Sequence, residues 1–333
     1  MILCCFIFFY GYCNNNRIIM DSSQLNIQDC VFFSIWCNTS GSVVYAKSIP
    51  GSLSIFSSTM INCTSVVSGG AVLYDCKENG NCIMEKVCGF SCWFSGNYVV
   101  GHERGQFAYI LVSMTRNNTI NFVSFSKCAD QKKDGVCSLA LRQGITSTKN
   151  TNSSFNYARY GSSFEWVLSN SSFICMCTFS HNQATQYTSL KINHGVDTGL
   201  TGHTIKCCNI VGNNGPDFGV ILFQGAGILN IDQCIFKGNS QYLLSSYGGY
   251  GGSCTLVARN CLISHSDTIS RRFNGGIVSL TNITYSVIST YQIIHYQSYE
   301  CFAEIPLIIS TIDRTSIYSK TKMIIIISMM IIV

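Results

Sequence analysis

One short pattern returns along the whole chain: a cysteine, an apolar residue two positions later, and an asparagine five positions later. It occurs at residues 92–97, 177–182, 208–213 and 234–239. Looser copies keep the apolar residue, and taking it as a marker gives Phe32, Ile61, Phe94, Phe125, Phe155, Phe179, Ile210, Phe236 and Ile263. Successive markers lie 24 to 33 residues apart. A period of this size predicts a solenoid, in which each repeat buries its apolar face against its neighbours.

A single repeat has the pattern of two or three short strands. Residues 228–236 alternate apolar and polar side chains, a turn follows at 237–239, and a second apolar run occupies 242–244. Alternation predicts strands with one buried face. The repeat has too few strands for a propeller blade and lacks a leucine consensus. We therefore predict an all-β fold, a right-handed parallel β-helix built as a single solenoid of about nine coils over residues 20–300.

In such a fold equivalent residues of successive coils stack on one another. The apolar markers are then expected to fill the core, and the list comprises Phe94, Phe179, Ile210, Phe236 and Ile263. The cysteine two residues earlier points to the same side of the strand. That register predicts a ladder of Cys177, Cys208, Cys234 and Cys261. Buried thiols are the preferred interpretation of the ladder, and disulfides between coils are the alternative.

The recurring asparagines, Asn182, Asn213 and Asn239, follow the marker strand at a predicted bend. Asparagine tolerates the left-handed backbone conformation that such a bend requires. Stacked side-chain amides can also hydrogen-bond from coil to coil. We therefore expect a structural role for these residues, not a catalytic one.

One segment, residues 75–92, departs from the repeat pattern. It contains Cys76, Cys82, Cys88 and Cys92 within 17 residues. We interpret it as a protruding loop closed by one or two disulfides. A metal site is disfavoured, because histidine and the usual ligand spacing are missing. Insertions of this kind often build the binding face of a repeat protein.

Composition limits the functional classes. Charged residues make up 11% of the chain, and the net charge of +5 is not concentrated in a run of Lys and Arg. This argues against a nucleic-acid partner. The 20 cysteines include no Cys-x-x-Cys pair. We expect no metal and no cofactor, with either disulfides formed in an oxidising compartment or buried free thiols.

Both ends of the chain are apolar. Residues 1–13 resemble a signal peptide, although the usual basic start is missing and a first buried strand or an incomplete N-terminus are alternatives. In the segment 301–333, the last eleven residues, 323–333, are apolar, whereas a spanning helix needs about 20. A truncated membrane anchor, a GPI-type signal and a capping strand remain open. Six glycosylation sequons fit secretion: Asn38, Asn62, Asn117, Asn152, Asn170 and Asn282.

The repeats also resemble a known family. The sequence G-G-A-V at 69–72 and the F-x-x-N copies at 94–97, 179–182 and 236–239 look like the paired motifs of polymorphic-membrane-protein repeats. The resemblance extends over about residues 25–276, with only one full copy of the first motif. It implies a right-handed parallel β-helix of the kind displayed on microbial surfaces and in large surface-protein families of protozoan parasites. It also implies adhesion or surface display.

Parallel β-helices also carry polysaccharide lyases and hydrolases, which normally need paired acidic residues. This chain has 16 acidic residues and no Asp-Asp pair. The nearest suggestion of a site is Asn193-His194-Gly195 with Asp197. Other candidates are isolated in the repeat pattern: Asp217, Asp232, His181 and His265.

We therefore expect a non-enzymatic protein, secreted or at the cell surface, that binds an unidentified protein or glycan. Membrane anchoring would use the C-terminal tail. A polysaccharide-active enzyme and an incomplete family member without activity are the alternatives.

Overall fold

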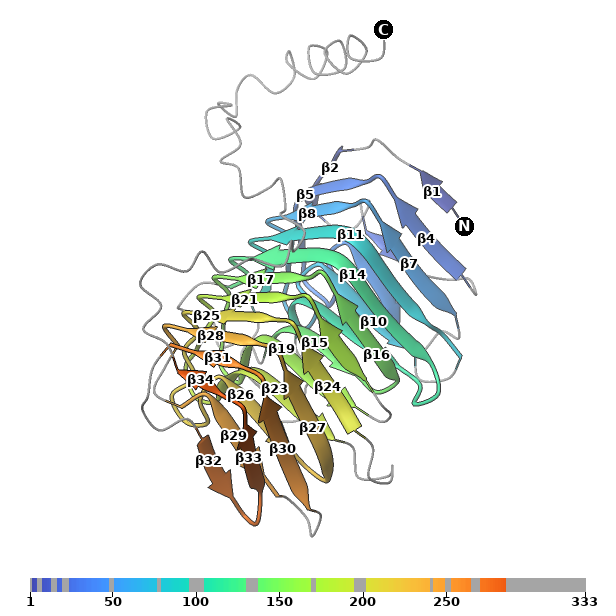
Figure 1. Ribbon diagram of the computed structural model, residues 1–333. Helices are drawn as coiled ribbons and strands as arrows, with labels where there is room; N and C mark the ends of the chain where they lie inside the picture. Colours follow the sequence, from blue (N-terminus) through green and yellow to red (C-terminus); the bar gives the residue numbers. More distant parts are fainter. Residues whose placement is uncertain are drawn as a thin grey trace, which may run out of the picture.

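The computed structural model describes residues 2–4, 8–12, 17–19, 24–47, 51–76, 79–95, 105–129, 137–168, 172–194, 202–239, 242–248, 253–264 and 270–285. Within these ranges the protein is all-β, has no helix, and stacks its strands as a parallel β-solenoid (Figure 1). The predicted fold class is therefore confirmed. The solenoid has about seven turns, slightly fewer than the nine counted from the sequence.

Each coil contributes strands to three walls. The first wall contains β1(Ile2–Cys4), β4(Gln24–Gln28), β7(Ser52–Phe56), β11(Cys82–Phe90), β14(Asn117–Ser126), β16(Ile145–Lys149), β20(Phe173–Cys175), β24(Gly202–Lys206), β27(Gly227–Asp232), β30(Cys254–Arg259) and β33(Ile277–Thr281). The second wall continues the same sheet after a bend. It contains β2(Phe8–Tyr12), β5(Val31–Cys37), β8(Thr59–Ile61), β17(Asn152–Ser154), β21(Thr178–Ser180), β25(Asn209–Val211), β28(Ile235–Lys237), β31(Leu262–Ile263) and β34(Thr284–Tyr285), while β11 and β14 run through both walls.

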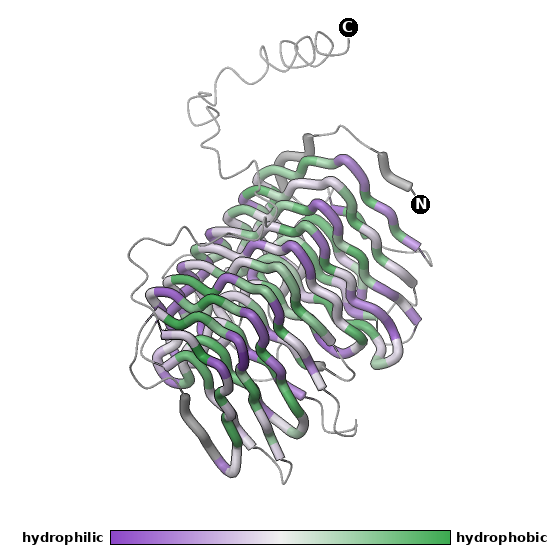
Figure 2. Tube along the Cα trace, in the orientation of Figure 1, coloured by the Kyte–Doolittle hydropathy of each residue, from purple (hydrophilic) through white to green (hydrophobic). Residues whose placement is uncertain are grey.

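The third wall is a separate parallel sheet that closes the coil. It contains β3(Ile18–Ile19), β6(Val44–Lys47), β10(Val72–Cys76), β13(Gly105–Val112), β15(Cys137–Arg142), β19(Gly161–Leu168), β23(Thr188–His194), β26(Ile221–Gln224), β29(Leu244–Tyr247) and β32(Ser270–Phe273). Short pairs at the corner leading to it are formed by β9(Thr64–Ser65) with β12(Trp93–Phe94) and by β18(Tyr157–Ala158) with β22(Gln183–Ala184). Apolar and polar residues alternate along the strands of these walls (Figure 2).

Two bends recur in the same place on every coil. At the first, between the first and second walls, one residue has a φ of 46–55°: Asp29, Ser57, Lys86, Phe122, Asn150, Met176, Cys207, Gln233, Asn260 and Asn282. At the second, after the second wall, the left-handed residues include Lys127, Phe155, His181, Gly212 and Gly238. A left-handed conformation costs a non-glycine residue roughly 1–2 kcal/mol. Each coil therefore needs compensating interactions next to its bends.

The core ladder follows the strand register of the second wall. It passes through Phe32, Met60, Gly89, Phe125, Ser153, Phe179, Ile210, Phe236 and Ile263. Six of the nine predicted markers lie on this ladder, and Ile61, Phe94 and Phe155 do not. Phe94 is buried but lies in β12 opposite Ser65. Phe155 is the left-handed residue of the second bend, 55% exposed, with its ring stacked on His181 at 4.9 Å between centroids.

Aromatic rings from the third wall fill the two gaps in the ladder. Gly89 has no side chain, and the ring of Phe107 occupies the space that its Cβ would need. Phe107 also stacks on Phe125 at 5.9 Å. At Ser153, the ring of Phe164 packs edge-on against both Phe125 and Phe179, at 5.2 and 5.4 Å. The core is therefore continuous although the ladder sequence is not.

Candidate functional site

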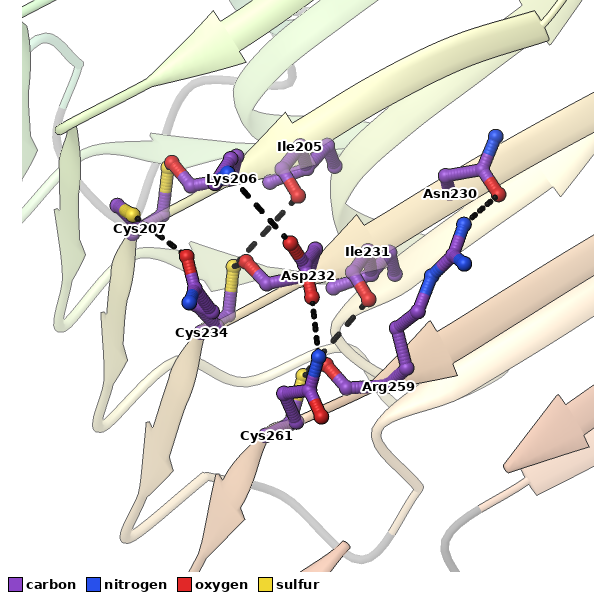
Figure 3. A network of polar contacts seen from close by, with 12 residues as sticks. Ile205, Lys206, Cys207, Asn230, Ile231, Asp232, Cys234, Arg259 and Cys261 are labelled. Carbon is purple, nitrogen blue, oxygen red and sulfur yellow. Dashed lines mark hydrogen bonds and ion pairs between the residues drawn. The ribbon is translucent and has the colours of Figure 1, made fainter. Parts of the chain in front are cut away.

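The cysteine ladder lies directly after the first bend. Cys177, Cys208, Cys234 and Cys261 are buried free thiols. Each Sγ donates to the carbonyl oxygen two residues earlier, across the left-handed residue, at 3.2–3.4 Å. The Sγ atoms of Cys177, Cys234 and Cys261 also lie 3.8–3.9 Å from a carbonyl of the preceding coil. Figure 3 shows these contacts for Cys234 and Cys261. The thiol thus satisfies the carbonyl group that the bend exposes.

Hydroxyl groups make the same hydrogen bond in earlier coils. The Oγ of Ser58 donates to the carbonyl of Phe56 at 2.7 Å, and the Oγ1 of Thr151 donates to that of Lys149 at 2.9 Å. Ser58 and Thr151 therefore place a donor at the position that the ladder thiols occupy in later coils. Burial, reinforced by the neighbouring thiols, raises the pKa of Cys208, so its thiol stays protonated and is a poor nucleophile.

The asparagine ladder lies after the second bend and extends one coil further than predicted. It comprises Asn156, Asn182, Asn213 and Asn239. The Nδ2 atoms of the first three donate to the Oδ1 of the next asparagine at 3.0, 3.0 and 3.3 Å. Each Nδ2 also donates to the core-ladder carbonyl of the preceding coil at 2.8–3.1 Å. Backbone amides of Asn156, Asn182 and Asn213 donate to the Oδ1 above them at 2.9–3.0 Å.

One expectation about these asparagines was wrong. The left-handed residue of the bend is the one before each asparagine: His181, Gly212 or, before Asn239, Gly238. The asparagine contributes hydrogen bonds from its side-chain amide, and its backbone does not adopt the left-handed conformation. In the N-terminal coils Cys63, Cys92 and Cys128 occupy this position. The Sγ of Cys63 and Cys92 donates to the core-ladder carbonyl of the preceding coil, at 3.7 and 3.3 Å.

The cysteine-rich segment 75–92 is not a protruding loop. Residues Cys82–Phe90 form β11, which pairs with β7 and β8 on one side and β14 on the other. Cys76, Cys82 and Cys92 are buried free thiols, whereas Cys88 forms a disulfide with a cysteine outside these four. The irregular spacing arises because β11 continues through the first bend at Lys86 without a break.

The sequons differ in accessibility. Asn38, Asn62, Asn117 and Asn282 are exposed. Asn152 is only 8% exposed, in β17 between β14 and β21, with its Nδ2 3.5 Å from the Oγ of Ser124. Its amide is therefore not accessible in the folded protein. Asn170 lies outside the described residues, as do Asn97, Asp197 and His265, and residues 301–333.

Two buried histidines meet at the corner between the third and first walls. His194 Nδ1 lies 2.9 Å from His203 Nε2, and the His203 ring packs against Phe223 at 6.2 Å. Burial, followed by His194, lowers the pKa of His203 to about 4. The sequence drew attention to His194 but not to His203. The alternation of residues 202–206 could have indicated that the His203 side chain is buried. At neutral pH His203 is uncharged and cannot act as a general acid.

The outward face of the third wall holds a buried ion cluster that the sequence did not reveal. The Glu165 side chain is 3% exposed, with Lys191 Nζ at 2.9 Å and an Arg142 nitrogen at 3.2 Å. Burial alone would raise the pKa of Glu165, but Lys191 and then Arg142 outweigh it and hold the pKa below its ordinary value. The carboxylate is therefore ionised and bound on both sides, as in a structural ion cluster.

The outer face of the first wall is the exposed surface of the solenoid. Its outward side chains follow columns along the axis, and polar contacts join successive coils. Lys206 Nζ lies 3.7 Å from Asp232, whose Oδ1 also accepts a 2.9 Å bond from Asn260 Nδ2 (Figure 3). An Arg259 nitrogen donates to Asn230 Oδ1 at 2.9 Å. Asp232 is thus part of a surface network.

The remaining single candidates do not converge. His181 stacks on Phe155 at the second bend, and Asp217 lies in the turn before β26. Within the described ranges, no three or more His, Cys, Asp or Glu residues are grouped so that they could hold a metal ion. No helix in that part of the chain is long and apolar enough to span a membrane. No protein-family model, curated protein or solved structure matches the chain.

Proposed function

We propose that this chain is a non-enzymatic, secreted or cell-surface β-helix protein of the adhesion or surface-display type. Its binding surface is the outer face of the first wall. The observation that carries this proposal is the continuity of that face, where outward side chains of successive coils stand in register from β4 to β33. Extended surfaces of this kind are what solenoid proteins use for binding.

The chemistry of this face supports a protein or glycan ligand. Exposed isoleucines lie in one outward column: Ile145 beside Asn117, and Ile228 and Ile277 on either side of Thr255. The next outward column but one carries Lys149, Lys206 and Arg259, all exposed. By contrast, outward residues of the third wall such as Glu165 and Leu222 are buried. Apolar side chains rimmed by polar and charged ones are typical of recognition surfaces.

Two further features support surface display. The repeats resemble those of polymorphic-membrane-protein β-helices, whose members are displayed on microbial surfaces. Four sequon asparagines, Asn38, Asn62, Asn117 and Asn282, are exposed and can accept a glycan in a folded, secreted protein. A membrane anchor, if present, would be the tail 323–333.

Surface biotinylation of intact cells expressing the protein tests export, and an N-glycosidase mobility shift is read on the same sample. We expect labelling and a shift. The shift should decrease when Asn62→Gln or Asn282→Gln is introduced, and it should not change with Asn152→Gln. Absence of both labelling and shift would contradict the proposal.

Binding by the first wall is tested with the purified protein on arrays of immobilised glycans and extracellular-matrix proteins. Ile228→Glu and Ile277→Glu should weaken any binding at least tenfold, because each places a charge in the apolar column. Val67→Glu is the matched control, since Val67 is as exposed as Ile228 but lies in the turn before the third wall. Equal loss in all three variants would place the binding surface elsewhere.

A further inference from the structure

Two free thiols differ from the others in their exposure. Of the free cysteines in the described part of the chain, Cys175 and Cys207 are partly exposed and the rest are buried. Both lie at the first bend, on neighbouring coils. Cys175 is the last residue of β20, and Cys207 follows β24 as the left-handed residue of the bend. Two accessible thiols therefore occur together on the outer surface.

The strand register places these two cysteines within disulfide range. Cys175 pairs directly with Lys206, so Cys207 is one residue further along the neighbouring strand. Strands about 4.8 Å apart and a step of about 3.8 Å along the chain give a Cα–Cα separation of about 6 Å. Disulfides require roughly 4.4–6.8 Å between these atoms. The strand register therefore allows a disulfide between the two coils.

The side chains point to the same side of the sheet. Ile174, before Cys175, is fully buried, so alternation turns Cys175 outward. The Sγ of Cys207 lies 3.6 Å from Gln233 Oε1 on the next coil, outside the core (Figure 3). The adjacent ladder thiols Cys177 and Cys208 point inward and are buried. A disulfide from Cys175 to a core thiol would have to pass through the backbone.

Lysines flank the pair on the same column. Lys149 and Lys206 pair with Cys175 from the coils on either side. The Nζ of Lys149 lies 5.1 Å from the Phe173 ring, and that of Lys206 lies near Asp232. Burial, Cys207 and Cys177 raise the pKa of Cys175 more than the lysines lower it. The Cys175 thiol is therefore neutral at rest, and its reaction accelerates as the pH rises.

We propose that Cys175 and Cys207 form a surface dithiol site that reacts with low-molecular-weight disulfides such as glutathione disulfide. The Cys175 thiolate attacks one sulfur of the disulfide, forms a mixed disulfide and releases one glutathione thiolate. The Cys207 thiolate then attacks the Cys175 sulfur and releases the second glutathione. The two protein thiols lose two protons and two electrons, and the glutathione disulfide is reduced to two thiols. The new bond links neighbouring coils.

The experiment incubates the native, full-length protein with glutathione disulfide and maps cysteine-containing peptides by mass spectrometry after alkylation. We expect one new linked pair of peptides, carrying Cys175 and Cys207, in addition to the pair that the Cys88 disulfide already gives before treatment. Its rate of formation should increase from pH 7 to pH 9. Cys175→Ser and Cys207→Ser should each abolish the link and leave a stable glutathione adduct on the remaining thiol. Cys254→Ser, which removes a buried thiol, is the matched control and should leave the link unchanged.

Three outcomes would overturn the proposal. The first is adducts on both cysteines without a link, and the second is a link between core thiols such as Cys234 and Cys261. The third is no reaction of the native protein at pH 9. The wild-type map decides between these outcomes even if a serine variant folds poorly. Circular dichroism of each variant shows whether its result can be compared with the wild type.

Discussion

The N-terminal and C-terminal coils solve the same structural problem with different side chains. After the first bend, the N-terminal coils use Cys30, Ser58, Val87, Val123 and Thr151, whereas successive C-terminal coils use Cys177, Cys208, Cys234 and Cys261. After the second bend, the N-terminal coils use Cys63, Cys92 and Cys128, and the C-terminal coils use Asn156, Asn182, Asn213 and Asn239. With the exception of Cys30, the cysteines at these two positions therefore change columns near the middle of the solenoid.

The first bend therefore accepts a thiol, a hydroxyl or a valine side chain, so its geometry selects a size more than one residue type, and the second bend accepts a thiol or an amide. A thiol offers one weak donor, whereas an asparagine offers two donors and an acceptor. Asn182 consequently bonds to both neighbouring coils, while the Sγ of Cys92 donates to Met60 of the preceding coil at 3.3 Å and to Phe90 of its own coil at 3.5 Å. We expect the C-terminal coils to be coupled more tightly at this bend.

The largest effect is expected from breaking the asparagine ladder. Asn182→Ala leaves the Asn156 amides and the Ser153 carbonyl without their partner in a buried site. At about 1–3 kcal/mol for each unsatisfied group, the free energy of unfolding should fall by about 4 kcal/mol. Cys92→Ala, the equivalent change in the N-terminal coils, should cost about half as much. Urea denaturation measures both, and equal losses would remove the distinction between the two regions.

Acid should destabilise the C-terminal coils first. Folding keeps His203 neutral with a pKa of about 4, whereas an unfolded histidine has a pKa of about 6.5. The unfolded chain therefore binds a proton that the folded protein does not. Stability should fall by about 3 kcal/mol as the pH decreases from 6.5 to 4. The groups that face His203 are His194, Phe223 and the neighbouring-coil residues Ser172 and Leu229.

Hydrogen exchange at pH 7 and pH 4.5 measures this effect coil by coil. Protection should decrease around β23, β24 and β27 before it decreases around β7 and β11. His203→Leu, which copies Leu229 of the next coil, should remove most of the pH dependence. A uniform loss of protection, or an unchanged pH profile in the variant, would contradict the role given to His203.

A smaller effect is expected from exchanging donors between the two regions. Cys234→Thr introduces the group that Thr151 uses after the same bend and should change the free energy of unfolding by less than about 1 kcal/mol. Cys234→Val keeps the shape but leaves the Asp232 carbonyl without this donor, at a cost of about 1–2 kcal/mol. The difference between the two variants in urea isolates the hydrogen bond. If valine were as stable as threonine, the donor would contribute nothing.

The smallest effect is expected at a marker that the structure excludes from the core. Phe155→Ala removes an exposed ring from the second bend and should cost less than about 1 kcal/mol. Phe179→Ala, its counterpart on the core ladder of the next coil, provides the comparison at about 3–5 kcal/mol. Thermal unfolding of the pair distinguishes them, and similar losses would mean that the register of this coil is assigned wrongly.

The sequence was sufficient to predict the period, the strand alternation and the parallel stacking, because these follow from a repeated apolar position. It also placed the cysteine and asparagine ladders correctly in the C-terminal coils. It failed at Gly89 and Ser153, where the ladder residue is not apolar and Phe107 or Phe164 from another wall fills the space. A ring from one wall that fills the core at a small residue of another wall is far from it in the sequence, so no local sequence pattern reveals the contact.

The function of individual polar residues was harder to predict. Each ladder thiol donates back across the left-handed residue of the first bend. The ten residues at that bend are of many types and lie in different local sequences, so no pattern marks it. The His194–His203 contact and the Glu165 cluster depend on strands brought together by the coil. The segment 75–92 looked irregular because β11 continues through its bend at Lys86 without a break.

The central claim is that the ladder cysteines are reduced, buried donors that hold the bends of the solenoid. The most direct test is the ¹³Cβ chemical shift of Cys177, Cys208, Cys234 and Cys261 in native protein purified without reductant. The account predicts shifts of reduced cysteine at all four positions, unchanged when a thiol reagent is added to the folded protein. Shifts of oxidised cysteine at neighbouring pairs would contradict it and would show that disulfides, not hydrogen bonds, join these coils.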